Sequence, residues 1–399
     1  MLSKNFVQIL DQEQERRDTR YMDIMHILRL SDYHYMDQKL GSSSYVGGTT
    51  HVPQYFPMQN SLLSTSENIV SQFLPENTPK ITKQIQIDAK INDFKDLINM
   101  VNKYEYCEDT EYNIDLKALT QIKPELLELN AMIGLTEFKN DVLNQLLYFV
   151  QNLHVGTNPD FMHTVLTGPP GTGKTEIAII LGRMYSKIGV LKKNVFKKVT
   201  RGDLIAGYLG QTAIKTKKII DECLGGCLFI DEAYSLANDY SGDSFSRECI
   251  DTLCESLSAH KGELMVIVAG YKDELNQTFF KANRGLESRF IWRFHLDNYS
   301  YLEMLNIFKK KVVENEWILD IPHDVLENWF RTNHAKFAHY GRDMELLFSY
   351  CKVVHSRRIY GGDIELKKRL TIDDIKNGLK QFTNHTNNVD KSNNYGLYV

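Results

Sequence analysis

The sequence predicts an α/β fold, in which a parallel five-stranded sheet lies between helices and a C-terminal helical lid follows. Two observations predict it. Between residues 161 and 296, short apolar runs typical of buried strands alternate with longer runs that have helical spacing, and such alternation favours a parallel sheet. From Ser300 onward the strand-like runs stop and helical spacing alone remains.

Composition limits the class of protein. The 399 residues suffice for two or three domains, and 42% apolar with 25% charged residues is typical of a soluble globular chain. The net charge of −4 argues against a nucleic-acid-binding surface over the whole chain. The six cysteines form no CxxC pair, and neither a secretory signal nor a membrane span is found. We therefore expect a cytoplasmic protein with reduced thiols and no membrane contact.

Five segments follow one another along the chain. Apolar residues at helical spacing within 1–40 predict a helix, and residues 41–68 are rich in Gly, Ser, Pro and Asn, as linkers are. We expect an N-terminal helical and disordered extension with its linker (1–84), a helical lead-in (85–130), the α/β domain (131–299), the helical lid (300–382) and an Asn-rich disordered tail (383–399).

The elements of the two structured domains can be placed in order. A short helix is expected at 124–130, and a longer one after Gly134 with Thr136 as its N-cap. One face of the longer helix carries Phe138, Val142, Leu146 and Phe149. The predicted strands are 161–167, 195–200, 227–233, 264–271 and 292–296, with helices at 176–189 and 247–260. The predicted lid helices are 301–316, 323–337, 342–358 and 371–382, with capping boxes at Ser300/Glu303 and Thr371/Asp374.

The segment GPPGTGKT, residues 168–175, indicates phosphate binding. It follows a predicted strand, opens a predicted helix and fits G-x-x-x-x-G-K-[ST]. Its glycines let backbone N–H groups turn toward phosphate oxygens, and the helix N-terminus adds partial positive charge. Lys174 is expected to reach the β- and γ-phosphates of ATP, and Thr175 to ligate Mg²⁺. The expected ATP-binding residues here are Gly168, Pro169, Pro170, Gly171, Thr172, Gly173, Lys174, Thr175 and Glu176.

Two acidic residues follow the apolar strand CLFI, residues 227–230. Ligands gather at the carboxyl ends of parallel strands, so Asp231 is placed to hold Mg²⁺. Glu232 can polarise the water that attacks the γ-phosphate. An acidic pair at a strand end is a weak signal alone, but after a phosphate loop it predicts an ATPase in which Lys174 and Glu232 are catalytic.

Two arginines lie just after the fourth predicted strand, in ANRGLESRF (282–290). Phosphoryl transfer needs positive charge near the developing γ-phosphate. Arg284 and Arg289 are poorly placed for the nucleotide of their own subunit, but either can reach that of a neighbour. From spacing alone, a solvated loop arginine is the better interpretation.

These motifs together resemble those of AAA+ ATPases, and more closely the CbbX/CfxQ group, which includes red-type Rubisco activases and the sporulation protein SpoVK. The resemblance covers roughly residues 120–382. IDEAYSL followed by an AGY strand is specific to this group. The segments that carry the resemblance are LNAMIGLTEFK (129–139), GPPGTGKT, VTRGDLIAGYLGQTAIKT (199–216), GGCLFIDEAYSL (225–236), VIVAGYKDEL (266–275) and GLESRF (285–290).

The resemblance implies a ring hexamer, expected to be a homo-hexamer, with ATP and Mg²⁺ between subunits. It implies that Ile133 and Gly134 contact adenine. It also implies that Arg289 is an arginine finger supplied in trans, and that Arg342 reports the nucleotide state from the lid.

The stretch Tyr208, Leu209 and Gly210 matches the central pore loop of the family, in which Tyr208 would grip a polypeptide. A flat aromatic side chain contacts varied partners without a fixed geometry, which suits sequence-tolerant pulling.

Three positions depart from the family pattern. Arg284 stands where relatives have a proline, so two arginines compete for the finger role and we prefer Arg289. Tyr271 stands near the place where many AAA+ proteins carry a sensor-1 asparagine. Glu345 stands where relatives often have a second basic residue after Arg342.

Three functions remain at this point, and remodelling of a protein substrate is preferred. An AAA+ ATPase that acts on nucleic acid, as a loader or helicase, is the alternative; a scaffold that binds nucleotide without hydrolysis is the third. The sequence does not indicate the substrate, the role of residues 1–84, or whether the ring is homo- or hetero-oligomeric. Basic clusters that would serve the alternative are formed by Lys192, Lys193, Lys197, Lys198, Lys215, Lys217 and Lys218.

Overall fold

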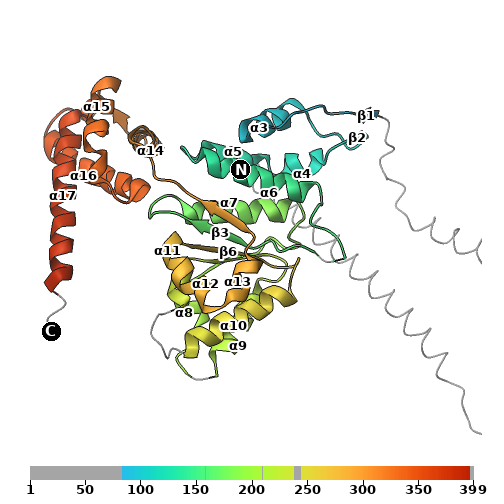
Figure 1. Cartoon of the computed structure of the whole chain (residues 1–399). Coiled ribbons are helices and arrows are strands. Elements are labelled where there is room, and N and C mark those ends of the chain that lie inside the picture. Colours follow the sequence, from blue (N-terminus) through green and yellow to red (C-terminus); the bar gives the residue numbers. More distant parts are fainter. Residues whose placement is uncertain (1–82, 158, 209, 238–243, 396–399) are drawn as a thin grey trace, which may run out of the picture. The chain divides into compact units, whose positions relative to one another are not determined.

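The structure is a computed structural model that describes residues 83–157, 159–208, 210–237 and 244–395 (Figure 1). Contacts divide the chain into two units, Met1–Thr78 and Pro79–Val399, and all described residues belong to the second. The helix expected within 1–40 and the linker at 41–68 lie outside the described residues. None of the described helices is both long and apolar enough to span a bilayer.

The core of the fold is a five-stranded sheet, whose strands β3 and β6 are labelled in Figure 1. Every pairing in it is parallel, and the strand order is β4-β5-β6-β3-β7. All five strands lie within the predicted ranges, so the predicted fold class is confirmed. Strand β6 separates β3 from β5, and the carboxyl ends of these three strands meet at one edge. The strands are β3 (Thr164–Thr167), β4 (Phe196–Val199), β5 (Cys227–Ile230), β6 (Met265–Gly270) and β7 (Trp292–His295).

Helices cover both faces of the sheet, which explains why its strands are continuously apolar. Alternate residues of β5 enter two separate cores: Phe229 packs with α6 and α7, and Leu228 and Ile230 pack with α9 and α10. Figure 1 shows α6 and α7 on one side of the sheet and α9 and α10 on the other. These helices are α6 (Thr136–Val150), α7 (Lys174–Lys187), α9 (Thr212–Glu222) and α10 (Ser244–Ala259).

Shorter helices complete the α/β domain. They are α8 (Arg201–Leu204), η1 (Ala233–Leu236), α11 (Lys272–Glu274), the π-helix η2 (Leu275–Phe279), α12 (Phe280–Ala282) and α13 (Arg284–Arg289).

The start of α6 differs from the prediction. Thr136 is the first helical residue, and the N-cap position is held by Leu135, which makes no side-chain cap. Gly134 and Leu135 both have positive φ, at 67° and 59°, so the chain turns before the helix begins. Leu135 is buried in the core, and this burial outweighs the cap chemistry of Thr136. The predicted apolar face, Phe138 to Phe149, is buried as expected.

The lead-in is not purely helical, contrary to prediction. Strands β1 (Lys83–Ile85) and β2 (Thr110–Tyr112) pair in parallel beside α3 (Phe94–Lys103), α4 (Leu116–Gln121) and α5 (Lys123–Ala131). The Asn113 side chain accepts from the Ile87 N–H at 2.7 Å and donates to its carbonyl at 3.0 Å. Strands of three residues are too short for a period-two pattern to be recognised.

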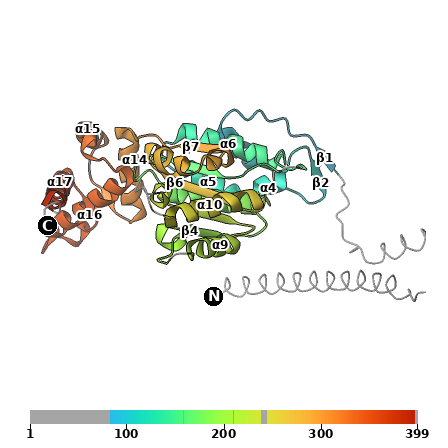
Figure 2. The ribbon, with the colours of Figure 1, turned by 60° about the horizontal axis from the view of Figure 1, so that its bottom comes forward.

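The lid consists of four main helices that pack on one another (Figure 2). The Ser300/Glu303 capping box is present. Two features differ from the prediction: a two-residue strand pair lies within the lid, and α17 continues through the Asn-rich segment to Tyr395. Once its first turns are packed, a helix extends at little cost. The elements are α14 (Tyr301–Glu314), β8 (Ile318–Leu319), α15 (His323–Asn333), η3 (His334–Lys336), α16 (Tyr340–Ile359), η4 (Ile364–Leu366), β9 (Arg369–Leu370) and α17 (Ile372–Tyr395).

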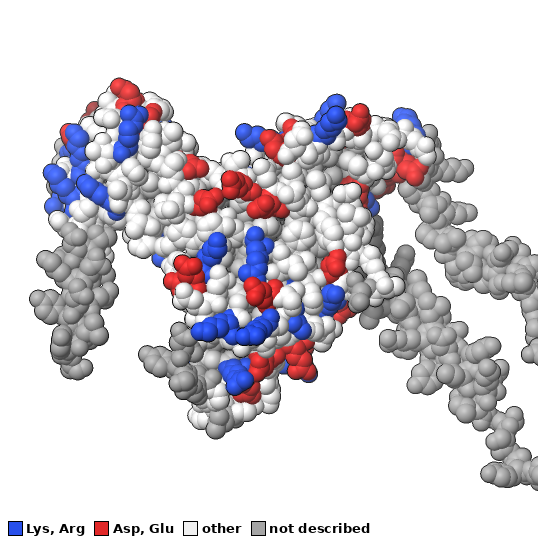
Figure 3. Space-filling view, viewed as in Figure 1, with Lys and Arg blue, Asp and Glu red and all other residues white. Residues whose placement is uncertain are grey.

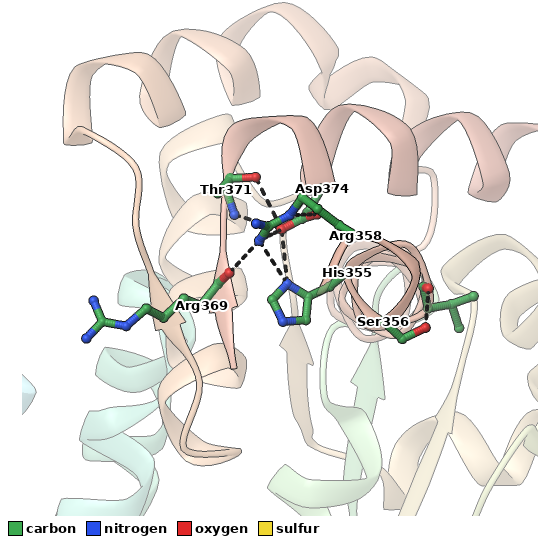
Figure 4. Close-up of polar contacts among 7 residues, drawn as sticks. His355, Ser356, Arg358, Arg369, Thr371 and Asp374 are labelled. Atoms are coloured by element: carbon green, nitrogen blue, oxygen red, sulfur yellow. Dashed lines mark hydrogen bonds and ion pairs between the residues drawn. The ribbon is translucent and has the colours of Figure 1, made fainter. Parts of the chain in front are cut away.

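A buried polar cluster joins α16 to the start of α17 (Figure 4). Asp374, which is 1% exposed, accepts hydrogen bonds from the Arg358 guanidinium at 2.9 and 3.0 Å and from the Thr371 N–H at 2.9 Å. Burial alone would raise the pKa of Asp374, but the hydrogen bonds from Arg358, Thr371 and His355 outweigh it and hold the pKa below its ordinary value. The bond from the Thr371 N–H is one half of the predicted capping box.

We expect Asp374→Asn to lower the free energy of unfolding of the lid by about 2–3 kcal/mol, because it leaves Arg358 without its counter-charge. Two of the three tryptophans, Trp317 and Trp329, lie in the lid, so urea unfolding followed by tryptophan fluorescence is a suitable measurement. Since the folded pKa of Asp374 is lowered, its contribution is complete above the ordinary value of 3.8 and is lost as the pH falls through the folded value.

The matched control is Asp373→Asn. Asp373 is the preceding residue on the same helix, and its exposed side chain meets only Lys376, at 3.9 Å, among the ion pairs of the described residues. Its stability change is expected to stay within about 0.5 kcal/mol. Equal losses in the two variants would contradict a structural role for the cluster.

Candidate nucleotide-binding site

The phosphate loop, Gly168–Gly173, joins β3 to α7. Gly171 and Gly173 have φ of 75° and 93°, a backbone region that residues with a Cβ rarely adopt. The predicted strand, loop and helix are therefore all present, with the loop at the carboxyl end of a central strand.

Lys174 is held inside this loop. Its Nζ donates to the carbonyls of Gly168 and Pro169, at 2.7 and 2.8 Å, and lies 5.5 Å from the centre of the Tyr271 ring. Burial lowers the pKa of Lys174, and the nearby Asp231 carboxylate partly opposes this shift. The ammonium thus stands where phosphate oxygens would replace carbonyl oxygens as its partners.

Two oxygen-bearing side chains suited to a divalent cation lie within hydrogen-bond distance of each other. The Thr175 hydroxyl, on the first turn of α7, donates to Oδ2 of Asp231, at the end of β5, over 3.2 Å. Mg²⁺ prefers hydroxyl, carboxylate and phosphate oxygens and keeps several waters, so this pair fits a nucleotide-held Mg²⁺. Lys198 also contacts the Asp231 carboxylate, at 2.6 Å.

Glu232 has a strained backbone, with φ 51° and ψ 46°. Non-glycine residues in this region persist only where the surroundings hold them, and they cluster at functional sites. Beside it, the rings of Tyr234 and Tyr271 stack with centroids 5.7 Å apart. Burial, together with the Glu232 carboxylate, raises the pKa of Tyr234 to about 12, so its hydroxyl stays neutral. Tyr234 is a site residue that the sequence analysis missed.

A cavity of about 500 Å³ connects these groups, a size typical of small-molecule sites. Of the predicted residues, Ile133, Pro170 to Glu176, Asp231, Glu232 and Arg342 line it, whereas Gly134, Gly168 and Pro169 do not. A Cβ on Gly134 would lie 2.1 Å from the Glu303 carboxylate, so its backbone is pressed against α14 rather than exposed to the cavity.

The lid supplies one wall of the cavity. Lys311 on α14 pairs with Glu345 on α16 at 2.7 Å, so the acidic residue that departs from the family pattern is matched by a lysine. No spacing in the sequence signals this pair, because the two helices meet only in the folded lid. The lid residues in the wall are Ile307, Lys310, Lys311, Glu314, Gly341, Arg342 and Glu345, and Tyr299 lines it just before the lid begins.

The phosphate loop and the lid touch through their backbones. The Gly341 N–H donates to the Gly171 carbonyl at 3.1 Å. Just before the lid begins, the Tyr299 side-chain hydroxyl donates to the Thr172 carbonyl at 3.2 Å. A Cβ on Gly171 would lie only 1.9 Å from the His339 carbonyl oxygen. A movement of the phosphate loop therefore displaces the first turn of α16 directly.

The two candidate arginine fingers lie on α13, and neither lines the cavity. The Arg289 guanidinium donates to Ser258 Oγ at 2.7 Å and to the Gly285 carbonyl at 2.5 Å, whereas Arg284 is exposed. This position agrees with the expectation that both arginines are poorly placed for the nucleotide of their own chain.

Tyr208 is 75% exposed and lies in the connection between α8 and α9, beside Gly210 with φ 76°. Leu209 lies outside the described residues. The tyrosine of the predicted pore loop is thus a surface aromatic, and it is not packed into the core.

Comparison with known proteins decides the family. The family described as "ATPase family associated with various cellular activities (AAA)" matches residues 164–295. A putative cfxQ-like protein of Acanthamoeba polyphaga mimivirus is 40% identical over 285 residues, which are 71% of this chain and 69% of that protein. The chain belongs to the AAA+ ATPases, in the CbbX/CfxQ group. The predicted family is therefore confirmed, and with it an enzyme that binds and hydrolyses ATP.

Other relatives match this AAA+ ATPase over a smaller part of their length. Stage V sporulation protein K of Bacillus subtilis is 37% identical over 199 residues, 48% of this chain and 61% of that protein. The ESX-1 secretion system protein EccA1 of Mycobacterium tuberculosis is 39% identical over 189 residues, 45% of this chain and 32% of that protein. The chain thus spans about a third of EccA1.

We expect Gly171→Ala to weaken nucleotide binding at least tenfold, because a methyl group there collides with the lid backbone and strains the loop. Isothermal titration with ADP measures the affinity. Hydrogen exchange at the first turn of α16 should rise in the same variant, which separates loss of the lid contact from a change in the loop alone.

Gly189→Ala is the control, since Gly189 also has positive φ, 81°, but nothing lies within 4 Å of the added Cβ. Its ADP affinity should match that of the unaltered protein. If ADP affinity and hydrogen exchange at α16 are both unaltered in the Gly171 variant, the contact between the loop and the lid has no role in nucleotide binding.

Proposed function

We propose that this AAA+ ATPase assembles into a homo-hexameric ring and uses ATP hydrolysis to remodel a protein substrate that Tyr208 grips in the central pore. The observation that carries the proposal is the exposed Tyr208 on a glycine-flanked loop, in a chain with a complete set of candidate residues for hydrolysis. Oligomeric action is typical of the family.

The predicted residues that line the cavity have chemical roles in this proposal. Lys174 leaves the loop carbonyls and binds the β- and γ-phosphates. Thr175 and Asp231 hold Mg²⁺, which when bound neutralises charge on the phosphates. Glu232 orients and polarises the attacking water. Ile133, an apolar residue that lines the cavity, supports the adenine ring.

The lid and the neighbouring subunit complete the site. Arg342 lines the cavity from α16, next to the backbone contact with Gly171, and is placed to report the state of the phosphates. Arg289 lies outside the cavity of its own subunit and, in this proposal, serves the nucleotide of its neighbour. Such a site hydrolyses ATP efficiently only within an assembly.

Action on nucleic acid is the weaker candidate. Several lysines of the basic clusters are engaged: Lys197 pairs with Glu222, and Lys215 donates to the carbonyls of Gly202 and Ile205. Figure 3 shows basic and acidic side chains interspersed on the face that it presents. We also propose a cytoplasmic location, because all six cysteines are free thiols.

We expect Glu232→Gln to bind ATP and to hydrolyse it at least a hundredfold more slowly, because the general base is lost. In lysate from the natural source with Mg²⁺-ATP, it should retain a protein substrate that mass spectrometry identifies. Lys174→Ala, which should not bind nucleotide, is the control. A partner that nuclease releases would favour the nucleic-acid function, and a Glu232 variant that stays monomeric in ATP would contradict the ring.

We expect Tyr208→Ala to keep basal ATP hydrolysis within about twofold and to abolish remodelling of the captured substrate, because the aromatic grip is lost while the nucleotide site is intact. Ile214→Ala is the matched control, since Ile214 is a nearby side chain on α9 with a similar exposure of 70%. Substrate unfolding coupled to ATP turnover measures the effect. Unimpaired remodelling by the Tyr208 variant would contradict the pore-loop assignment.

A further inference from the structure

Asp231 has two partners at one oxygen atom. Oδ2 of its carboxylate accepts from the Thr175 hydroxyl at 3.2 Å and meets the Lys198 ammonium at 2.6 Å. The proposed function assigns Asp231 to Mg²⁺, and the inference below rests on that assignment. Lys198 belongs to neither of the two nucleotide motifs, and it does not line the cavity.

The sheet itself directs Lys198 to this carboxylate. Strand β4 pairs in parallel with β5, so that Lys198 lies opposite Phe229 and the Asp231 N–H donates to the Val199 carbonyl at 3.1 Å. Side chains alternate between the faces of a sheet, which puts Lys198 and Asp231 on the same face as α7.

Aromatic packing fixes the path of the side chain. Phe196 and Phe229 stack at 6.0 Å on this face, and the Lys198 ammonium lies 5.8 Å from the centre of the Phe229 ring. The lysine therefore passes over a rigid aromatic surface before it reaches Asp231, which reduces the entropy cost of holding the pair.

The ammonium and a divalent cation exclude each other at this oxygen. Two cations within a few ångströms repel strongly in a partly buried site, and Oδ2 already has the Thr175 hydroxyl as a second partner. The Lys198 side chain is 45% exposed and can swing into solvent, whereas that of Asp231 is only 20% exposed and is held at the end of β5. Lys198 is thus the partner that can leave.

We infer that Lys198 is a built-in counter-cation of Asp231, which must release the carboxylate before Mg²⁺ binds with the nucleotide. Lys198 therefore sets the Mg²⁺ concentration at which nucleotide binding tightens. It is a positioning residue, because it acts on the carboxylate and not on the phosphates.

The strand offers a matched control one residue away. Lys197 lies on the opposite face of β4 and pairs with Glu222 of α9, so Lys197→Met removes the same charge from the same strand without touching Asp231. Lys198→Arg keeps a cation of similar reach and should behave as the unaltered protein does.

The experiment measures ADP affinity by isothermal titration at a series of MgCl₂ concentrations, starting from EDTA. ADP affinity is expected to increase with the Mg²⁺ concentration. We expect Lys198→Met to lower the Mg²⁺ concentration at the midpoint of this increase by about two- to fivefold, since partly exposed ion pairs contribute free energies of this size. The Lys197 variant should keep the midpoint of the unaltered protein. An unchanged or raised midpoint in Lys198→Met would overturn the inference.

Asp231→Asn separates this inference from the proposed function. If Asp231 holds the metal, this variant loses most of the Mg²⁺-dependent tightening. A tightening that persists in Asp231→Asn would refute the assignment of Asp231 to Mg²⁺, and the role of Lys198 would be refuted with it. Loss of tightening in Asp231→Asn together with an unchanged midpoint in Lys198→Met would refute the role of Lys198 alone.

Discussion

At Gly171 the phosphate loop and the first turn of α16 approach so closely that no side chain fits between them. The His339 carbonyl oxygen occupies the space of a Cβ, and the Gly341 N–H bonds the Gly171 carbonyl. Gly134 lies beside the Glu303 side chain of α14, where an added Cβ would be 2.1 Å from the carboxylate oxygen. The Gly171 contact joins the α/β domain to the lid at the nucleotide cavity itself, so a shift of the phosphate loop also displaces the first turn of α16.

The strand order explains why the chemical groups of the site come from distant parts of the sequence. Strand β6 lies between the strands that carry the phosphate loop and Asp231, so its own carboxyl end, at Tyr271, comes to lie among them. The sequence comparison with the family expects an asparagine near this position in many AAA+ proteins, and here the phenol of Tyr271 lines the cavity. Both side chains offer a hydrogen-bond donor, but the ring also stacks on Tyr234 and faces Lys174.

Charge around the cavity is balanced between elements rather than within them. Lys198 of β4 meets Asp231 of β5, and Lys311 of α14 meets Glu345 of α16. In both pairs a lysine outside the nucleotide motifs partners an acidic residue at a motif position. Each pair is partly exposed, so its contribution is small and another cation can replace the lysine at the carboxylate.

The sequence by itself determined the family, the order of the five strands along the chain and the positions of the phosphate loop and the acidic pair. It could do so because these features depend on local periodicity and on motifs of adjacent residues. The cap of α6 and the short strands of the lead-in and the lid depended instead on packing that no local pattern records. Tertiary structure alone decided that Gly134 faces α14, that Lys311 meets Glu345, and that Lys198 reaches Asp231. Each of these is a contact between elements far apart in sequence, and such contacts exist only once the sheet and the lid have formed.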